Sequence, residues 1–347
     1  MKFVKIFFLI TLSAGLLIGS AGVGFAKSKV IKMRHHTHTP AGHIANKVIV
    51  GDYLKKLEKA TNNKIKITNF PGAVLATKSS ALEACSSGIA TLSRLTNSTV
   101  PGKFPLMDLL STPGIGITDH EMGAYVIMKL FANHPDLVKK ELPGVKFMFA
   151  YTMAQTVVGT SKVPVRRMED LKGLKLRVGG KGPAMFYQKL GATPANIIMP
   201  DLFMSMEKGV IDGWNMAMNA VALLGLQEVT KYYTQTSFFA GPIVTVMNLR
   251  TWNSLSPDIQ KQINSVNTIE TAMDVGRIAD GLAQKDREMA MNSNGEYITL
   301  APEERARWQK VAESLWDKEV AILDSRGLPG RALLNEVLQL VQEYKNR

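Results

Sequence analysis

The chain has 347 residues and a formal charge of +13, from 42 basic and 29 acidic residues. This length exceeds what one hydrophobic core usually holds, so we expect two lobes. The basic surface attracts anions, but no nucleic-acid recognition motif accompanies the charge, which argues against a nucleic-acid-binding protein. The single cysteine, Cys85, excludes an intramolecular disulfide and lies among small apolar residues, as a buried thiol does.

The N-terminal segment has the layout of a secretory signal. Lys2 and Lys5 precede an apolar run over residues 6–18, and small residues follow up to Ala26. The run is shorter than the roughly 20 residues that span a bilayer. We therefore predict a cleavable signal over residues 1–26 and export to the periplasm. An uncleaved anchor is the alternative.

Strands and helices alternate in the next part of the chain. The pattern predicts a three-layer α/β lobe with strands at 30–34, 64–70 and 89–93 and helices at 44–60 and 79–87.

Two pairs of predicted strands cross between the lobes, and the tail is helical. The strand pairs are 145–151 with 155–160, and 232–239 with 243–249. Apolar residues at steps of three and four predict a long amphipathic helix from 257 to about 291. Pro302 begins a further helix that ends at Gly327, and Pro329 begins the last one.

The segment 168–214 contains the clearest candidate site. Residues 174–178 alternate like a short strand that carries Arg177, and Gly179 and Gly180 then permit a tight turn before Pro183 starts a helix. A helix N-terminus and an arginine side chain both bind carboxylates well. The pattern alone is also compatible with a surface arginine and a simple glycine turn.

The same segment resembles the DctP-type solute receptors of TRAP transporters. The resemblance rests on D-L-K-G-L-K-L-R-V at 170–178, G-A-T-P at 191–194, G-V-I-D-G at 209–213 and Asp201 between the last two. It continues at Phe70-Pro71-Gly72 and in the segments 101–113, 228–236 and 248–257.

This resemblance implies an α/β periplasmic binding protein of the Venus-flytrap type, with an interlobe cleft and long C-terminal helices, one of which spans both lobes. We expect lobe I to contain residues 27–153 and 242–282, and lobe II residues 154–241 and 283–347. The implied function is capture of a small organic acid by cleft closure, followed by delivery to the membrane subunits of a TRAP permease. No cofactor and no catalysis are implied.

Arg177 is the predicted carboxylate ligand, and other candidates follow predicted strands. The histidines at 35, 36, 38 and 43 lie near the end of the first strand, where a metal site, a ligand contact such as one from His36, and a plain polar loop all remain open. Arg94 follows the third strand and is either a second cation of the site or a solvated side chain.

Departures from the family pattern bear on the ligand. Many members carry an arginine where this chain has Val157 and an asparagine where it has Met216, although Asn215 can substitute by a one-residue shift. We therefore expect a monocarboxylate whose apolar body packs near Trp214, Met216, Val157 and Met199. Trp214 as a plain core residue is the alternative.

Three other functions remain open from the sequence. A C4-dicarboxylate is the ligand if Arg94 or a histidine supplies a second cation. A sensory protein that reports to a membrane kinase shares the same fold and pocket. An exported enzyme is disfavoured, because neither G-x-S-x-G nor H-E-x-x-H nor paired metal-ligand spacing occurs.

Overall fold

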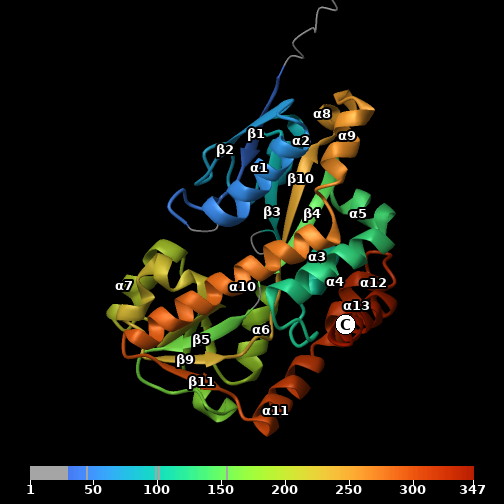
Figure 1. Cartoon of the computed structure of the whole chain (residues 1–347). Helices are drawn as coiled ribbons and strands as arrows, with labels where there is room; N and C mark the ends of the chain where they lie inside the picture. The colour runs from blue at the N-terminus through green and yellow to red at the C-terminus, as the bar shows by residue number, and fades with distance from the viewer. Residues whose placement is uncertain (1–29, 44–45, 98–99, 101, 154) are drawn as a thin grey trace, which may run out of the picture.

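A computed structural model describes residues 30–347 except 44, 45, 98, 99, 101 and 154. The predicted signal segment 1–26 lies outside the described residues. The described chain forms two β-sheets that are flanked by helices (Figure 1), so the predicted α/β class is confirmed.

The first sheet lies at the top of Figure 1 and has the strand order β2-β1-β3-β10-β4. β1 is parallel to β2 and β3, whereas β10 is antiparallel to β3 and β4. Its strands are β1 (Ile31–His36), β2 (Ile65–Phe70), β3 (Leu92–Thr96), β4 (Val145–Met153) and β10 (Gly241–Asn248). The helices that accompany these strands along the chain are α1 (Gly51–Ala60), α2 (Ala81–Ser87), α3 (Pro105–Leu110), α4 (His120–Asn133), α5 (Pro135–Glu141), α8 (Leu249–Ser254) and α9 (Pro257–Asn264).

The second sheet has the order β11-β9-β5-β8-β6-β7. β6 is parallel to β7 and β8, and β5 is antiparallel to β8 and β9. Its strands are β5 (Thr156–Thr160), β6 (Lys175–Val178), β7 (Thr193–Ala195), β8 (Gly213–Ala217), β9 (Tyr232–Gln235) and β11 (Glu296–Thr299), and the helices between them are α6 (Lys181–Lys189) and α7 (Leu202–Glu207).

Two short segments connect the sheets, at 153–156 between β4 and β5 and at 235–241 between β9 and β10. The two segments are hydrogen-bonded to each other, because the backbone amides of Thr236 and Ser237 donate to the Thr156 carbonyl at 3.0 and 2.9 Å. The predicted crossing of two strand pairs between the lobes is therefore confirmed.

Helix α10 (Ile269–Asn292) spans both halves of the molecule (Figure 1). Ala272 and Val275 near its start pack in the core of the first sheet, and Ala283 and Ala290 near its end pack in a core of the second. The long helix predicted from residue 257 is broken, because α9 ends at Asn264 and the Thr268 side chain caps a new helix by accepting from the Thr271 amide.

The last helices do not all pack with the second sheet, although residues 283–347 were expected to belong to lobe II. Only the first of them, α11 (Pro302–Glu313), packs with the second sheet, through Trp308 and Ala312. Helices α12 (Trp316–Asp324) and α13 (Gly330–Lys345) belong to the first core. The reason is that α13 buries a stripe at three- and four-residue spacing beside α4, formed by Leu333, Leu334, Val337, Leu340 and Val341.

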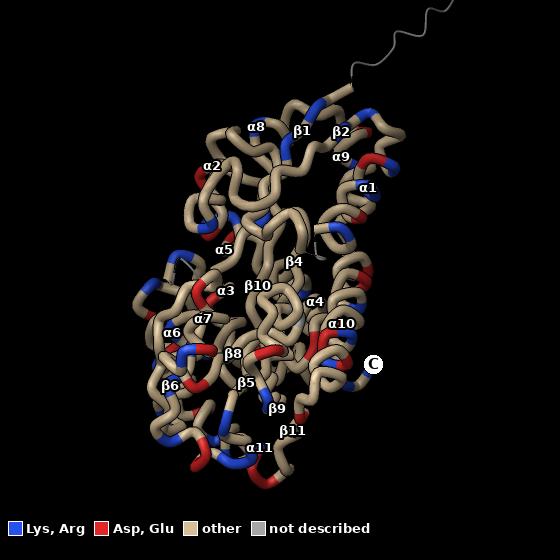
Figure 2. The backbone as a smooth tube through the Cα atoms, turned by 90° about the vertical axis from the view of Figure 1, so that its left-hand side faces the viewer, with Lys and Arg blue, Asp and Glu red and all other residues tan. Residues whose placement is uncertain are grey.

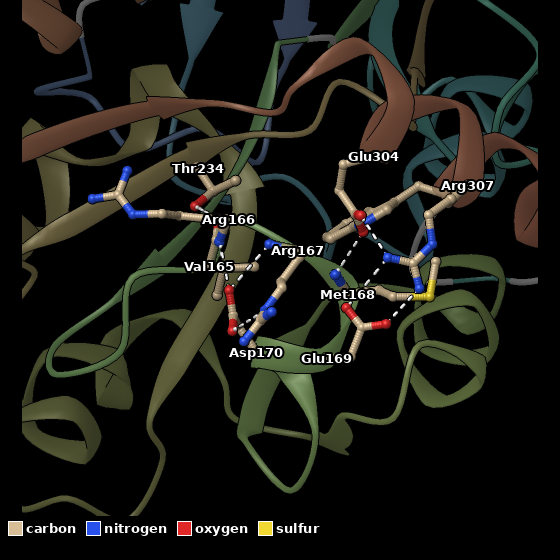
Figure 3. Close-up of polar contacts among 10 residues, drawn as sticks. Val165, Arg166, Arg167, Met168, Glu169, Asp170, Thr234, Glu304 and Arg307 are labelled. Carbon is tan, nitrogen blue, oxygen red and sulfur yellow. Dashed lines mark hydrogen bonds and ion pairs between the residues drawn. The ribbon is translucent and has the colours of Figure 1, made fainter.

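The family-like M-E-D-L-K-G segment has a structural role. The Asp170 carboxylate accepts from the backbone amides of Arg166 and Arg167, at 2.9 and 3.0 Å, and so closes the turn before β6 (Figure 3). Glu304 of α11 accepts from the Met168 amide at 2.7 Å, while Arg307 binds both Glu304 and Glu169 (Figure 3). These contacts hold α11 against the turn that precedes β6 of the second sheet.

The charges are distributed over the whole molecule. Lysine and arginine, and also aspartate and glutamate, occur in both halves of the molecule (Figure 2). Among the described helices, none is both long and apolar enough to cross a membrane.

Candidate ligand-binding site

A cavity of about 960 Å³ is lined by residues of both sheets and of the segments that connect them. The first sheet and the segments that follow its strands contribute several polar residues, namely His38, Thr39, His43, Lys78, Arg94 and Tyr151. The second sheet and its helices contribute Arg177, Gly179, Met199, Asn215, Met216 and Leu223. A ligand in this cavity would therefore contact both halves of the molecule.

Arg177 lies on β6, whose neighbours are β7 and β8. Its Nε donates to the Ile197 carbonyl at 3.2 Å, which holds the guanidinium group in place. Gly179 lies beside the guanidinium group, and a Cβ there would lie 3.4 Å from Nη1. In the described part of the chain, no protein acceptor binds the terminal nitrogens of Arg177, so they are available for a ligand.

Arg94 lies on β3 and is only 6% exposed. Its Nη1 donates to the Thr39 hydroxyl at 2.5 Å and its Nη2 to the Tyr151 hydroxyl at 2.6 Å, whereas Nε has no hydrogen-bond partner. Among the described residues, no carboxylate forms an ion pair with Arg94 or Arg177. In the part of the chain that the structure describes, neither positive charge is thus paired with a carboxylate.

Lys78 also lines the cavity and was not among the predicted site residues. Burial, together with the positive charges of Arg94 and Arg177, lowers the pKa of Lys78 to about 8. This role was not predictable from local pattern, because Lys78 lies in a loop before α2 without periodicity. Only the fold brings this loop, and with it Lys78, to the cavity.

Two histidines complete the polar wall. Burial, Arg94 and Lys78 lower the pKa of His38 to about 3, and burial and Arg94 lower the pKa of His43. Both rings are therefore neutral at pH 7 and can offer a hydrogen bond, but no charge, to a ligand. Among the described residues, no group of three or more His, Cys, Asp and Glu side chains is arranged to hold a metal ion.

The opposite part of the lining is apolar. Met199 and Met216 lie there together with three residues that follow β8. These three are Ala220, Leu223 and Leu224. Asn215 is buried in the same wall, and its side-chain amide donates to the Val157 carbonyl at 3.0 Å. The arrangement suits a ligand with an acidic end and an apolar body.

Arg177, Arg94, Asn215, Met216 and Met199, all predicted, thus line one cavity. Trp214 does not, because its ring is fully buried against Gly159 and Tyr233, and its Nε1 donates to the Thr230 hydroxyl at 3.0 Å. Val157 is also fully buried in that core. Trp214 and Val157, which were predicted to pack near the ligand, thus lie in the core and outside the cavity lining.

His36 is likewise not part of the lining. It ends β1, between β2 and β3 in the sheet, and is fully buried. Burial lowers its pKa, and neither ring nitrogen has a hydrogen-bond partner in the described structure. His38 and His43, further along the same segment, line the cavity instead.

The sequence profile of bacterial extracellular solute-binding protein family 7, known as DctP, matches residues 36–321. The chain belongs to this family. It is 24% identical over 332 residues to the C4-dicarboxylate-binding periplasmic protein DctP of Rhodobacter capsulatus, covering 88% of this chain and 92% of that one.

Solved structures of TRAP solute-binding proteins share the fold of this DctP-family receptor. One from Desulfovibrio salexigens has a TM-score of 0.84 at 24% identity, covering 92% of this chain and 98% of that chain. Another, from a marine metagenome, holds 3-hydroxybenzoate and has a TM-score of 0.84 at 22% identity, with coverages of 91% and 99%. The chain is therefore a TRAP-type extracytoplasmic solute receptor of two-lobe α/β architecture.

Proposed function

We propose that this receptor captures a small organic acid in the cavity and delivers it to the membrane subunits of a TRAP permease. The observation that carries the proposal is the uncompensated guanidinium group of Arg177, which lies in a cavity lined by both halves of the molecule. A carboxylate matches its two free donor groups. The export signal predicted over residues 1–26 supports a periplasmic location for this activity.

Capture requires that the ligand prefer the closed form. An acid bound to Arg177 of the second lobe also contacts the first lobe when the cleft closes, so it stabilises that form. A permease that recognises the closed form would then receive only loaded receptors. A sensory role uses the same steps with a membrane kinase as the receiver.

A monocarboxylate with an apolar body is the finer proposal. The apolar wall around Met199, Met216 and Leu223 supports it, since burial of apolar ligand surface is favourable there. The marine metagenome receptor with 3-hydroxybenzoate is a relative of this kind.

A dicarboxylate is the second candidate, favoured by one specific observation. Arg94 and Lys78 supply further positive charge from the first lobe to the cavity that Arg177 also lines. The C4-dicarboxylate-binding relative of Rhodobacter capsulatus agrees with this reading.

Thermal unfolding with a panel of acids tests the proposal. Mature protein from residue 27 is melted with benzoate, 3-hydroxybenzoate, branched monocarboxylates and succinate. An acid at about 100 times its dissociation constant stabilises the native state by about 2.7 kcal/mol, which raises the melting temperature. The class of acid that produces the shift decides between the two candidates, and no shift with any acid contradicts the proposed function.

Substitution of Arg177 tests its role. Arg177→Ala should weaken binding of the best acid about 10- to 100-fold, because hydrogen bonds to a charged group contribute about 1.5–3 kcal/mol. Titration calorimetry measures the change. Lys175→Ala is the matched control, since Lys175 is an exposed basic residue on the same strand outside the cavity lining. Equal affinities of Arg177→Ala and wild type would exclude Arg177 as the carboxylate ligand.

A further inference from the structure

Basic side chains from three segments meet in the cavity. Lys78 comes from the loop before α2, Arg94 from β3 and Arg177 from β6 of the other sheet. The neutral polar groups nearest this cluster are His38 and His43 of the segment after β1 and the Tyr151 hydroxyl, which accepts from Arg94.

The same cavity is also lined by the charged residues Asp108, Lys181, Glu319 and Arg326. The Asp108 carboxylate accepts from Asn97 and from the Gly102 amide, and Glu319 interacts with Lys181 and Lys318. The charges that act on Lys78, in contrast, are those of Arg94 and Arg177.

The like charges of this cluster repel one another. Lys78 is half-buried and interacts repulsively with both guanidinium groups, and Arg94 is nearly fully buried with its Nε unpartnered. Repulsion between like charges is stronger where water is partly excluded. A bound acid converts this repulsion into attraction.

Lys78 differs from Arg94, Arg177 and His38 in the pH range over which its charge changes. The guanidinium groups stay charged at all ordinary pH values, and the pKa of His38 is near 3. The pKa of Lys78, at about 8, lies inside the range in which periplasmic proteins are easily studied. Mildly alkaline solution therefore removes one positive charge from the cluster, and that charge belongs to Lys78.

We propose that Lys78 is a specificity-determining residue of this site, whose protonated ammonium group binds the acidic ligand together with Arg177 and Arg94, so that ligand binding is coupled to protonation of Lys78. This inference rests on the proposed capture of an organic acid. Lys78 of the first lobe would thus account for the preference of the site for anionic ligands and for the loss of binding at alkaline pH.

The sign of the coupling follows from linkage. A bound anion favours the charged form of Lys78, so its pKa is higher in the complex than in the free receptor. Below the pKa of the free receptor, Lys78 is already protonated and binding is strongest. Above it, binding must take up a proton, and affinity falls by about tenfold per pH unit until the pKa of the complex is reached.

The experiment compares the full mature wild type with K78R and K78M, with 3-hydroxybenzoate and succinate as probes. Dissociation constants are measured by titration calorimetry at pH 7 and pH 9.5. Wild type should lose about tenfold or more in affinity between these values, and K78R should lose little because arginine keeps its charge. K78M should bind more weakly than wild type at pH 7 and show no loss at pH 9.5.

Proton uptake gives a readout that a purely structural role of Lys78 would not change. Titrations at pH 8.5 in two buffers of different ionisation enthalpy should show uptake of about half a proton or more by wild type, and none by K78R or K78M. K139M is the control of equal net charge, because Lys139 is exposed on α5 outside the cavity lining. It should behave as wild type.

The outcomes separate the two proposals. If a probe binds but K78M retains wild-type affinity, or wild type takes up no proton, the role of Lys78 is overturned while the proposed function stands. If neither probe binds wild type and no acid of the panel raises its melting temperature, both proposals fail together. Melting curves of unliganded K78M verify that this variant is folded.

Discussion

Gly159 lies directly opposite Trp214 in the second sheet, where the two residues are paired on β5 and β8. A Cβ at position 159 would lie 2.2 Å from Cζ2 of the indole ring. Absence of a side chain there allows the ring to lie flat in the core, where the Thr230 hydroxyl accepts from its Nε1. One glycine thus explains why Trp214 is a core residue and does not line the cavity.

Gly159→Ala should destabilise the protein by about 1–3 kcal/mol, as overpacking of a closed core does. Urea unfolding at pH 7 measures the loss. Gly281→Ala is the control, because Gly281 is exposed on α10 with no atom within 4 Å of its Cβ position, and alanine there should stabilise by about 0.5–1 kcal/mol. Equal stability of the two variants would show that Trp214 moves aside without cost.

At the scale of elements, α4 and α10 are joined to the connection between the sheets through Asp280. This carboxylate accepts from the backbone amides of His120 and Glu121 at the start of α4, at 3.0 and 3.2 Å. It also accepts from the His120 ring at 2.6 Å and from the side-chain amide of Gln155 at 2.5 Å. Gln155 has φ +53°, and Ser237 of the other connection has φ +47°, conformations that cost energy for non-glycine residues.

Asp280→Ala should lower the free energy of unfolding by about 1–3 kcal/mol, since it leaves several half-buried donors without an acceptor. Asp274→Ala on the same helix removes an exposed ion pair with Arg277 and should change stability by less than about 1 kcal/mol. Urea unfolding of both variants at pH 7 is the measurement. A smaller loss for Asp280→Ala than for Asp274→Ala would contradict this account of Asp280.

The contribution of Asp280 should also depend on pH. Burial raises the pKa of this carboxyl, but hydrogen bonds from His120 and from backbone amides outweigh burial and leave the pKa below its ordinary value. The stabilisation is therefore complete above about pH 4 and is lost as the pH falls through the folded-state pKa. The difference in stability between wild type and Asp280→Ala should shrink accordingly in acid.

At the scale of the whole molecule, the two sheets are linked by two short segments and by α10. The cavity between them is large for a small acid, and its charged residues come from both sides. The proposed closure of the two halves would bring Arg177 toward Arg94 and Lys78, and a bound anion would offset the repulsion between these like charges.

The radius of gyration from small-angle X-ray scattering should decrease when wild type is saturated with the acid that stabilises it most. The physical reason is that the bound acid adds contacts available only in the closed form. Arg177→Ala at the same acid concentration should keep the radius of the free protein. A wild-type radius unchanged by a saturating ligand would contradict capture by closure.

Much of this architecture was predictable from local pattern. The alternation of apolar residues gave the strands on both sides of each connection, and the strand with Arg177 followed by two glycines gave the centre of the site. These features depend on neighbours within a few residues, so periodicity and turn chemistry are sufficient. The helix break near Thr268 was missed, because the apolar spacing continues through it while the local cap ends α9.

Long-range packing decided the rest. Trp214, Val157 and His36 have the residue types of ligand contacts, yet the sheets bury all three away from the cavity. Lys78 lies in an unremarkable loop, yet folding places it beside two arginines distant in sequence.

The sequence by itself determined the family, the α/β class and the arginine proposed to bind the carboxylate, because the order of the motifs and the short-range geometry depend on consecutive residues. Only the tertiary structure decided which side chains share the cavity with Arg177 and where α12 and α13 pack. The physical reason is that cavity lining and helix docking depend on which surfaces meet across the fold, and charge repulsion or apolar burial between distant residues exists only once they meet.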